Sequence, residues 1–107
     1  MIVVCKYLVL KGYNGITLFP FIILRHYSFR DNKVLINHER IHLKQQLELL
    51  VIGFYLWYII EFLVLYVKYK NWNKAYRNIS FEQEAYSNES DLMYLKDRPL
   101  FAFLKFY

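Results

Sequence analysis

Apolar residues form short β-branched runs near the N-terminus and longer helical patterns further along the chain. Residues 2–10 are an apolar run rich in Val, and the sequence GYNG at residues 12–15 is a strong turn signal. The sequence ITLFPFIILR at residues 16–25 predicts a second strand. Pro20 inside it indicates an edge strand, because proline cannot donate to a central ladder. We therefore expect an N-terminal β-hairpin with one imperfect edge.

Helical periodicity begins after the polar sequence SFRDN at residues 28–32, whose Asp and Asn side chains can cap a helix by accepting from its first free amides. The pattern predicts one helix from Val34 to about Leu50 and a later helix from about Lys74 to Tyr94. An Arg-Pro pair near the C-terminus predicts the end of regular structure.

Residues 49–67 are apolar except for Glu61. This stretch is long enough to cross the hydrocarbon core of a membrane. It is equally long enough to form the turn and second arm of a buried helical hairpin, with Gly53 near the bend. The predicted fold class is α+β and mostly helical, with the hairpin followed by about three packed helices in a single minimal domain covering residues 1–107.

The composition is 57% hydrophobic and 21% aromatic, which excludes a disordered chain because the apolar surface more than offsets the entropy of ordering. The net charge of +5 favours anionic surroundings. No nucleic-acid-binding motif is found, so we expect no nucleic-acid partner. A basic cluster directly after the apolar stretch is typical of a membrane edge, and a solvated face is the alternative interpretation; it consists of Lys68, Lys70, Lys74 and Arg77.

Cysteine usage and the N-terminal sequence bear on localisation. The lone Cys5 cannot form an internal disulfide, so nothing indicates an oxidising compartment. The apolar start MIVVCKYLVLKG is interrupted by Lys6 and followed by no small-residue cleavage site, so it is a poor signal peptide. We expect a cytoplasmic or membrane-associated protein.

The sequence NHERIHLKQQ at residues 37–46 contains two of the three histidines of the chain. Residues four apart share a helix face, so His38 and His42 can each direct one nitrogen at the same ion. Glu39 lies beside that face, where a carboxylate could hold a metal-bound water and take its proton. This is the H-E-x-x-H arrangement of zinc metallopeptidases. Catalytic zinc normally takes three protein ligands, so a third is required.

The predicted helix at residues 74–94 supplies the best candidate for that third ligand. Helical spacing places Glu82 in the middle of an apolar stripe and Glu84 on the opposite, wet face. A buried carboxylate without a partner is costly, and a metal ion would supply the partner. Asn78 and Glu89 share the face of Glu82, so either could orient a ligating histidine.

Other candidates for the third ligand are weaker. Glu48 follows the histidines on the same predicted helix, but on a polar strip turned away from them. His26 could reach the site from a loop, although a single histidine near a strand end is more often a surface side chain.

The sequence HERIH followed downstream by FEQEAY resembles the gluzincin-type zinc metallopeptidases, which include HtpX-like membrane proteases and ImmA/IrrE-like soluble ones. The resemblance covers two short motifs and the order of the elements. It implies that His38, His42 and Glu82 are zinc ligands and that Glu39 is the general base. It also implies a peptide or protein substrate lying along an edge strand above the zinc helix, a role that ITLFPFIILR could fill.

A zinc site within one chain constrains the helices. If residues 34–69 formed one continuous helix, Tyr69 would lie roughly 40 Å from His42, too far for the following residues to bring Glu82 back. A reversal near Gly53 places Glu82 at about the height of His42 instead.

An oxyanion stabiliser is also needed for peptide hydrolysis. Tyr86, one turn after Glu82, is the candidate that we assign to this role. Tyr76 and Arg77 are the alternatives.

Two main hypotheses follow. The first is a zinc-dependent metallopeptidase in which a zinc-bound water, deprotonated by Glu39, hydrolyses a peptide bond. The second is a small membrane-associated structural or interaction protein with a non-catalytic or accidental H-E-x-x-H site. The apolar stretch and the basic cluster favour this second hypothesis. A zinc-stabilised fold without catalysis is a third possibility.

Overall fold

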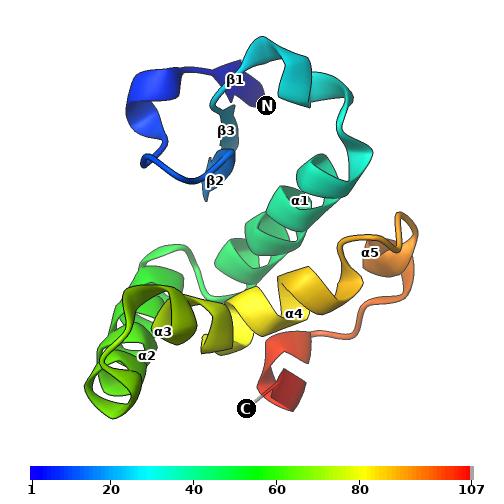
Figure 1. Ribbon diagram of the computed structural model, residues 1–107. Helices are drawn as coiled ribbons and strands as arrows, with labels where there is room; N and C mark the ends of the chain where they lie inside the picture. The colour runs from blue at the N-terminus through cyan, green and yellow to red at the C-terminus, as the bar shows by residue number, and fades with distance from the viewer. Residues whose placement is uncertain (107) are drawn as a thin grey trace.

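A small three-stranded sheet stands at the N-terminal end of the molecule (Figure 1). The structure, a computed structural model, describes residues 1–106. Strands β1 (Ile2–Val4), β2 (Gly15–Leu18) and β3 (Phe21–Leu24) are arranged in the order β1-β3-β2. Strand β1 runs parallel to β3, whereas β2 runs antiparallel to it.

The segment expected to form one strand over residues 16–25 is in fact a hairpin of its own. Strands β2 and β3 pair as Leu18 with Phe21, so that Phe19 and Pro20 form the turn between them. Pro20 therefore interrupts no strand, and its missing donor is not needed there. Strand β3 is the central strand, and β1 and β2 are the two edge strands. The predicted first strand is also shorter, because a 3-10 turn at Lys6–Leu8 follows β1.

Helix α1 (Lys33–Glu48) begins at Asn32, whose side chain accepts a hydrogen bond of 3.1 Å from the Leu35 amide, as the capping pattern predicts. A 3-10 turn at Tyr27–Asp31 precedes it. The chain reverses direction at Leu50 and Val51, which have positive φ angles of 57° and 64°. Helix α2 (Ile52–Tyr69) then starts one residue before Gly53, where the bend was expected.

The third predicted helix is two helices, α3 (Trp72–Asn78) and α4 (Ser80–Asn88), joined at the extended residue Ile79. Ile79 is fully buried in the core, which explains why the chain breaks there: the break directs this side chain inward. Glu61 of α2 satisfies the first turn of α4 by accepting hydrogen bonds from the Ser80 amide and hydroxyl at 2.6 and 2.8 Å. A short helix α5 (Tyr94–Asp97) and a 3-10 turn at Ala102–Phe106 complete the described chain.

Helix α1 lies between the sheet on one side and helices α2 and α4 on the other (Figure 1). One apolar cluster, Ile22, Leu24 and Ile36, joins the sheet to α1. A second cluster joins α2, α4 and the C-terminal turn; it consists of Phe54, Ile79, Phe81 and Phe103. The predicted α+β, mostly helical fold class is confirmed, and the motif at residues 37–46 occupies the central helix.

Helix α2 differs from the other helices in its exposure. It has 18 residues with a mean hydropathy of 1.4, and is long and apolar enough to cross a membrane by length and composition. Only 6% of its residues are buried against the rest of the chain. Its inward side carries the core residue Phe54, and most of its outward side faces away from the protein.

The Glu61 cap of α4 can be tested by mutation. We expect Glu61→Ala to lower the free energy of unfolding by about 1–2 kcal/mol, because the first-turn donors of α4 lose their acceptor. Glu61→Gln keeps an acceptor oxygen and should lose distinctly less. Urea denaturation followed by circular dichroism measures both, and equal stability of Glu61→Ala and the wild type would contradict this role.

Candidate metal centre

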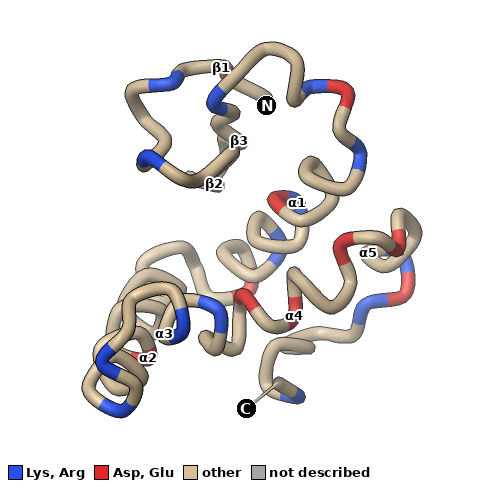
Figure 2. The backbone as a smooth tube through the Cα atoms, in the orientation of Figure 1, with Lys and Arg blue, Asp and Glu red and all other residues tan. Residues whose placement is uncertain are grey.

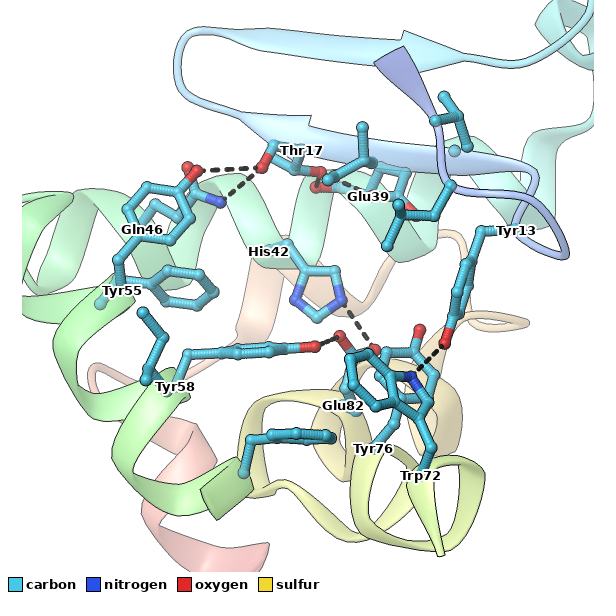
Figure 3. A pocket seen from close by; sticks show the side chains of 17 residues that line it. Tyr13, Thr17, Glu39, His42, Gln46, Tyr55, Tyr58, Trp72, Tyr76 and Glu82 are labelled. Atoms are coloured by element: carbon cyan, nitrogen blue, oxygen red, sulfur yellow. Dashed lines mark hydrogen bonds and ion pairs between the residues drawn. The ribbon is translucent and has the colours of Figure 1, made fainter. Parts of the chain in front are cut away.

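Helices α1 and α4 bring together the three predicted ligands, His38, His42 and Glu82, all of which are buried. The His42 Nε2 atom lies 3.2 Å from His38 Nε2 and 3.1 Å from Glu82 Oε1. The His38 Nε2 atom lies 3.4 Å from the same oxygen. Figure 3 shows His42 and Glu82 directed at each other across the pocket.

These three separations match the edges of a metal coordination tetrahedron. Zinc–nitrogen and zinc–oxygen bonds of about 2.0–2.1 Å give ligand–ligand distances of about 3.3–3.4 Å in a regular tetrahedron. Two imidazole nitrogens 3.2 Å apart can share at most one proton, so either a proton or a metal ion must lie between their facing lone pairs. The cluster can therefore hold a metal ion.

The electrostatics of the cluster describe its metal-free state. Burial alone lowers the pKa of His42, but the Glu82 carboxylate more than offsets this and raises it to about 9. Burial would raise the pKa of Glu82, but His42 and His38 together hold it well below its usual range. In the absence of metal, His42 is thus a cation beside a carboxylate, and its proton occupies the place that a metal ion would take.

Gln45 fixes the ring of His42. Its Oε1 atom lies 2.8 Å from His42 Nδ1, while its Nε2 donates to the Phe81 carbonyl at 3.1 Å and to Glu84 Oε1 at 2.9 Å. Because both amide protons are engaged, the oxygen must face the imidazole and accept from Nδ1–H. That tautomer leaves Nε2 of His42 available for a metal ion.

Tyr58 of α2 orients the third ligand. Its hydroxyl donates to Glu82 Oε2 at 2.8 Å (Figure 3). Burial, followed by the charge of Glu82, raises the pKa of this phenol far above its usual value, so it remains a donor. The other oxygen, Oε1, is the one that faces both imidazoles. Tyr58 therefore favours a single ligating oxygen.

Glu89 lies beside His38, as the sequence predicts. Its Oε2 atom is 3.3 Å from His38 Nδ1, although the angles do not form a hydrogen bond and Nδ1 has none. The end of α4 is held there by Asn37, whose side-chain amide donates to the backbone carbonyls of Asn88, Glu89 and Asp91. Asn78, the other predicted orienting residue, instead donates to the Lys74 carbonyl in its own helix.

The predicted location of Glu84 on a wet face is wrong. Glu84 and Glu48 are both buried around the guanidinium of Arg98, whose side chain is only 1% exposed. Arg98 contacts Glu84 through Nε and Nη2, and it bonds both oxygens of Glu48 at 2.9 Å. The arginine offsets one of the two negative charges and ties the C-terminal segment to α1 and α4. Because Glu84 accepts from Gln45, the network continues to His42.

Glu39 of α1 lies against strand β2 of the sheet. The Thr17 hydroxyl is 2.7 Å from Glu39 Oε1 and 2.9 Å from its backbone carbonyl, and both residues are buried. Gly15 of β2 lies close by, since a Cβ added there would be in ordinary contact with Glu39 Cγ at 3.6 Å. The edge strand and the predicted base are thus joined directly.

Two tyrosine hydroxyls meet near the histidines. Tyr86 packs its ring edge-on against His38 with centroids 4.5 Å apart, and its hydroxyl lies 3.2 Å from that of Tyr76. Burial raises the pKa of both phenols, so both keep their protons. Arg77 lies over the Tyr86 ring, with its guanidinium carbon 3.9 Å from the ring centroid. His26, the loop candidate, is exposed and packs on Phe29 instead.

A cavity of about 340 Å³ opens beside the cluster. Strand β2 and the motif form one wall, while aromatic residues of α2 and α3 form the other (Figure 3). Its polar lining comes mainly from Glu39, His42 and Glu82, and the rest is largely apolar and aromatic, including Tyr55, Phe62 and Trp72. The cavity can thus receive a bulky apolar group next to the cluster.

Sequence reasoning missed Gln45, Tyr58 and Arg98. The signal for Gln45 was present, because it shares the histidine face of α1. Tyr58 lies inside an apolar run where a hydroxyl has no distinguishing pattern. Arg98 comes from a non-helical segment, so no periodicity could locate it.

Comparison of the chain with protein-family models, with curated proteins and with solved structures gives no match. The resemblance to gluzincins therefore rests on the two motifs and on the His–His–Glu geometry alone, a geometry that is not specific to that group.

Metal binding should release a proton. The raised pKa of His42, about 9, means that the metal-free protein holds this proton at pH 7 and must lose it when Nε2 binds a metal ion. Apparent zinc affinity should rise about tenfold per pH unit below pH 9 and level off above it. Calorimetry of zinc binding at pH 7 in buffers of different ionisation enthalpy measures the number of protons released. Zinc binding without any proton release would contradict the site.

Gln45→Leu should lower zinc affinity by about 10–100-fold, because the Nδ1–H acceptor that fixes the His42 tautomer is lost. A competition titration with a chromophoric chelator measures the affinity. Gln83→Leu is the matched control, since Gln83 lies on α4 but donates to the Arg77 carbonyl rather than to a histidine. Equal affinities for the two variants, with circular dichroism showing both folded, would refute the orienting role.

Proposed function

We propose that this protein is a zinc-dependent metallopeptidase of the gluzincin type. The observation that carries the proposal is the convergence of His38 Nε2, His42 Nε2 and Glu82 Oε1 within 3.1–3.4 Å of one another, beside the Glu39 carboxylate. Two imidazoles and one carboxylate are the donor set of catalytic zinc in several peptidases, which leaves a fourth position for water or substrate. Zinc bound there would lower the pKa of a water molecule and polarise a peptide carbonyl.

Glu39 is the proposed general base. The Thr17 hydroxyl donates to Oε1, which fixes the carboxylate under the edge strand. Oε2 is then the oxygen that accepts the proton of the attacking water and delivers it to the leaving amine. Thr17 thereby has a positioning role that links β2 to the chemistry.

Strand β2 is the proposed substrate-binding edge. In its two-residue hairpin with β3, the backbone groups of Gly15, Thr17 and Phe19 point away from β3. The Gln46 side chain already pairs with the Thr17 carbonyl at 2.8 Å and with the Phe19 amide at 2.9 Å. The segment from Gly15 to the Thr17 amide would therefore pair with an extended peptide, running past Glu39.

Tyr86 and Tyr76 are the proposed oxyanion donors. Both hydroxyls are protonated, they form a pair, and the Tyr86 ring lies against His38. A phenol O–H donates to a developing oxyanion without carrying a charge of its own. The apolar cavity then favours peptides with a bulky apolar side chain next to the scissile bond.

Two variants separate metal binding from catalysis. Glu39→Gln should retain one zinc ion per chain and its Thr17 contact, but lose hydrolysis of a fluorogenic unfolded protein by about 10²–10⁴-fold. Glu82→Ala should lose the zinc itself. Metal analysis and fluorescence measure the two quantities. Hydrolysis by Glu39→Gln at the wild-type rate would exclude Glu39 as base.

The alternative is a membrane-associated interaction protein with a non-catalytic site, which the exposed apolar side of α2 favours. Purified wild-type protein without metal would support that alternative. Bound zinc without hydrolysis of any peptide, together with unfolding on zinc removal, would indicate a structural zinc site instead.

A further inference from the structure

The outward side of α2 carries a continuous apolar stripe. Its members recur every three or four residues and therefore lie along one side of the helix. Each is more than half exposed in the structure, and together they are Ile52, Leu56, Ile59, Ile60, Leu63, Val64 and Val67. Leu47 and Leu50 extend it at the α1–α2 turn, where they are 55% and 83% exposed. An apolar surface of this length marks an interaction site.

This stripe is separate from the core. The opposite side of α2 packs against α3, α4 and the C-terminal turn through residues such as Phe54, Trp57 and Phe62. The stripe residues have no part in either core cluster. The stripe therefore does not stabilise the fold through core packing, and it is available to bind a partner.

Positive charge and exposed aromatic rings gather at the C-terminal end of the stripe. Lys68, Lys70 and Lys74 are exposed around the α2–α3 turn, where Figure 2 shows basic positions close together. The ammonium groups of Lys68 and Lys74 lie 5.2 and 4.5 Å from the centroid of the Tyr69 ring. Tyr66 and Trp72 are exposed beside them, and residues 66–78 contain no acidic residue. This order of apolar surface, aromatic belt and lysines matches the polarity gradient of an anionic leaflet.

The packing of α3 against α2 indicates whether α2 crosses a membrane or lies on its surface. Trp72 packs against Phe62 with ring centroids 4.8 Å apart, and Ser80 bonds to Glu61, so α3 runs back beside the C-terminal third of α2. Helix α3 carries Lys74 and Arg77, and neither is buried. If α2 crossed the bilayer, these charges would lie in hydrocarbon beside it, which is costly.

We propose that α2 docks in the plane of an anionic lipid surface, with its apolar stripe among the acyl chains and the α2–α3 lysines at the headgroups. Such in-plane helices bind through buried apolar area together with electrostatic attraction. The proposal does not depend on catalysis. If the proposed peptidase activity also holds, Ile59 belongs both to the stripe and to the cavity wall, so substrate would enter at the membrane surface.

Vesicle sedimentation of the 107-residue chain tests the proposal. Binding should be strong to phosphatidylcholine vesicles containing 30% phosphatidylserine, weak to pure phosphatidylcholine, and reversed by 0.5 M sodium chloride. Each lysine at the surface contributes a factor of about five, so Lys68→Gln, Lys70→Gln and Lys74→Gln combined should weaken binding about 100-fold. The control removes three exposed lysines elsewhere, at Lys33, Lys44 and Lys96, and should lose much less.

A second pair of variants tests the apolar stripe. Ile60→Asp should abolish vesicle binding, whereas Leu100→Asp, an exposed leucine outside the stripe, should bind as the wild type does. Several results would overturn the proposal: equal binding to neutral vesicles, equal loss in the two lysine triples, or retention at alkaline carbonate pH, which indicates a spanning helix. A wild-type dimer that Ile60→Asp converts to monomer, without vesicle binding, would assign the stripe to a second copy instead.

Vesicle binding needs no turnover, so its failure is distinguishable from a failure of the proposed hydrolysis. Circular dichroism of each variant shows whether the fold persists. Because Ile60 is largely exposed and contributes to neither core cluster, its substitution should leave the fold intact.

Discussion

The buried contact between Glu82 and the two histidines constrains the rest of this fold. A carboxylate enclosed by apolar side chains is stable only beside compensating charge or donors, and the imidazoles of α1 supply these from one side. To bring α4 there, the chain must reverse after α1 and bend again after α2. Leu50 and Val51, with positive φ angles, provide the first change of direction, and Lys70, with a φ of 53°, lies at the second. The extended Ile79 then separates α3 from α4.

The contacts around this cluster form two layers. Gln45 of α1, Tyr58 of α2 and Glu89 at the end of α4 touch the three candidate ligands. Gln45 in turn contacts the ion-pair network of Arg98 with Glu48 and Glu84. This network, rather than apolar side chains, fills the interior at that end of α1. A network in which every buried charge has partners holds a single geometry more strictly than apolar packing does. A metal ion that prefers a fixed tetrahedron needs such geometry.

Much of this arrangement is predictable from the sequence because it depends on local spacing. The interval between His38 and His42 and the capping Asn32 determine α1 and its histidine face, and the apolar neighbours of Glu82 mark that carboxylate as unusual. The hairpin was harder, since an uninterrupted apolar run does not reveal that Phe19 and Pro20 form a turn. Glu84 was misplaced because helical spacing reports only which side of a helix a residue takes. It cannot report that a distant arginine will cover that side.

The position of Arg98 in the chain has a consequence for how the protein is made. All three candidate ligands are translated before the arginine that bridges Glu84 and Glu48. Until that residue leaves the ribosome, Glu84 and Glu48 lack the shared guanidinium that joins the C-terminal segment to α1 and α4. Completion of the cluster is therefore delayed until nearly the whole described chain has emerged. A nascent chain would therefore expose its histidines before the network that supports Gln45 is complete.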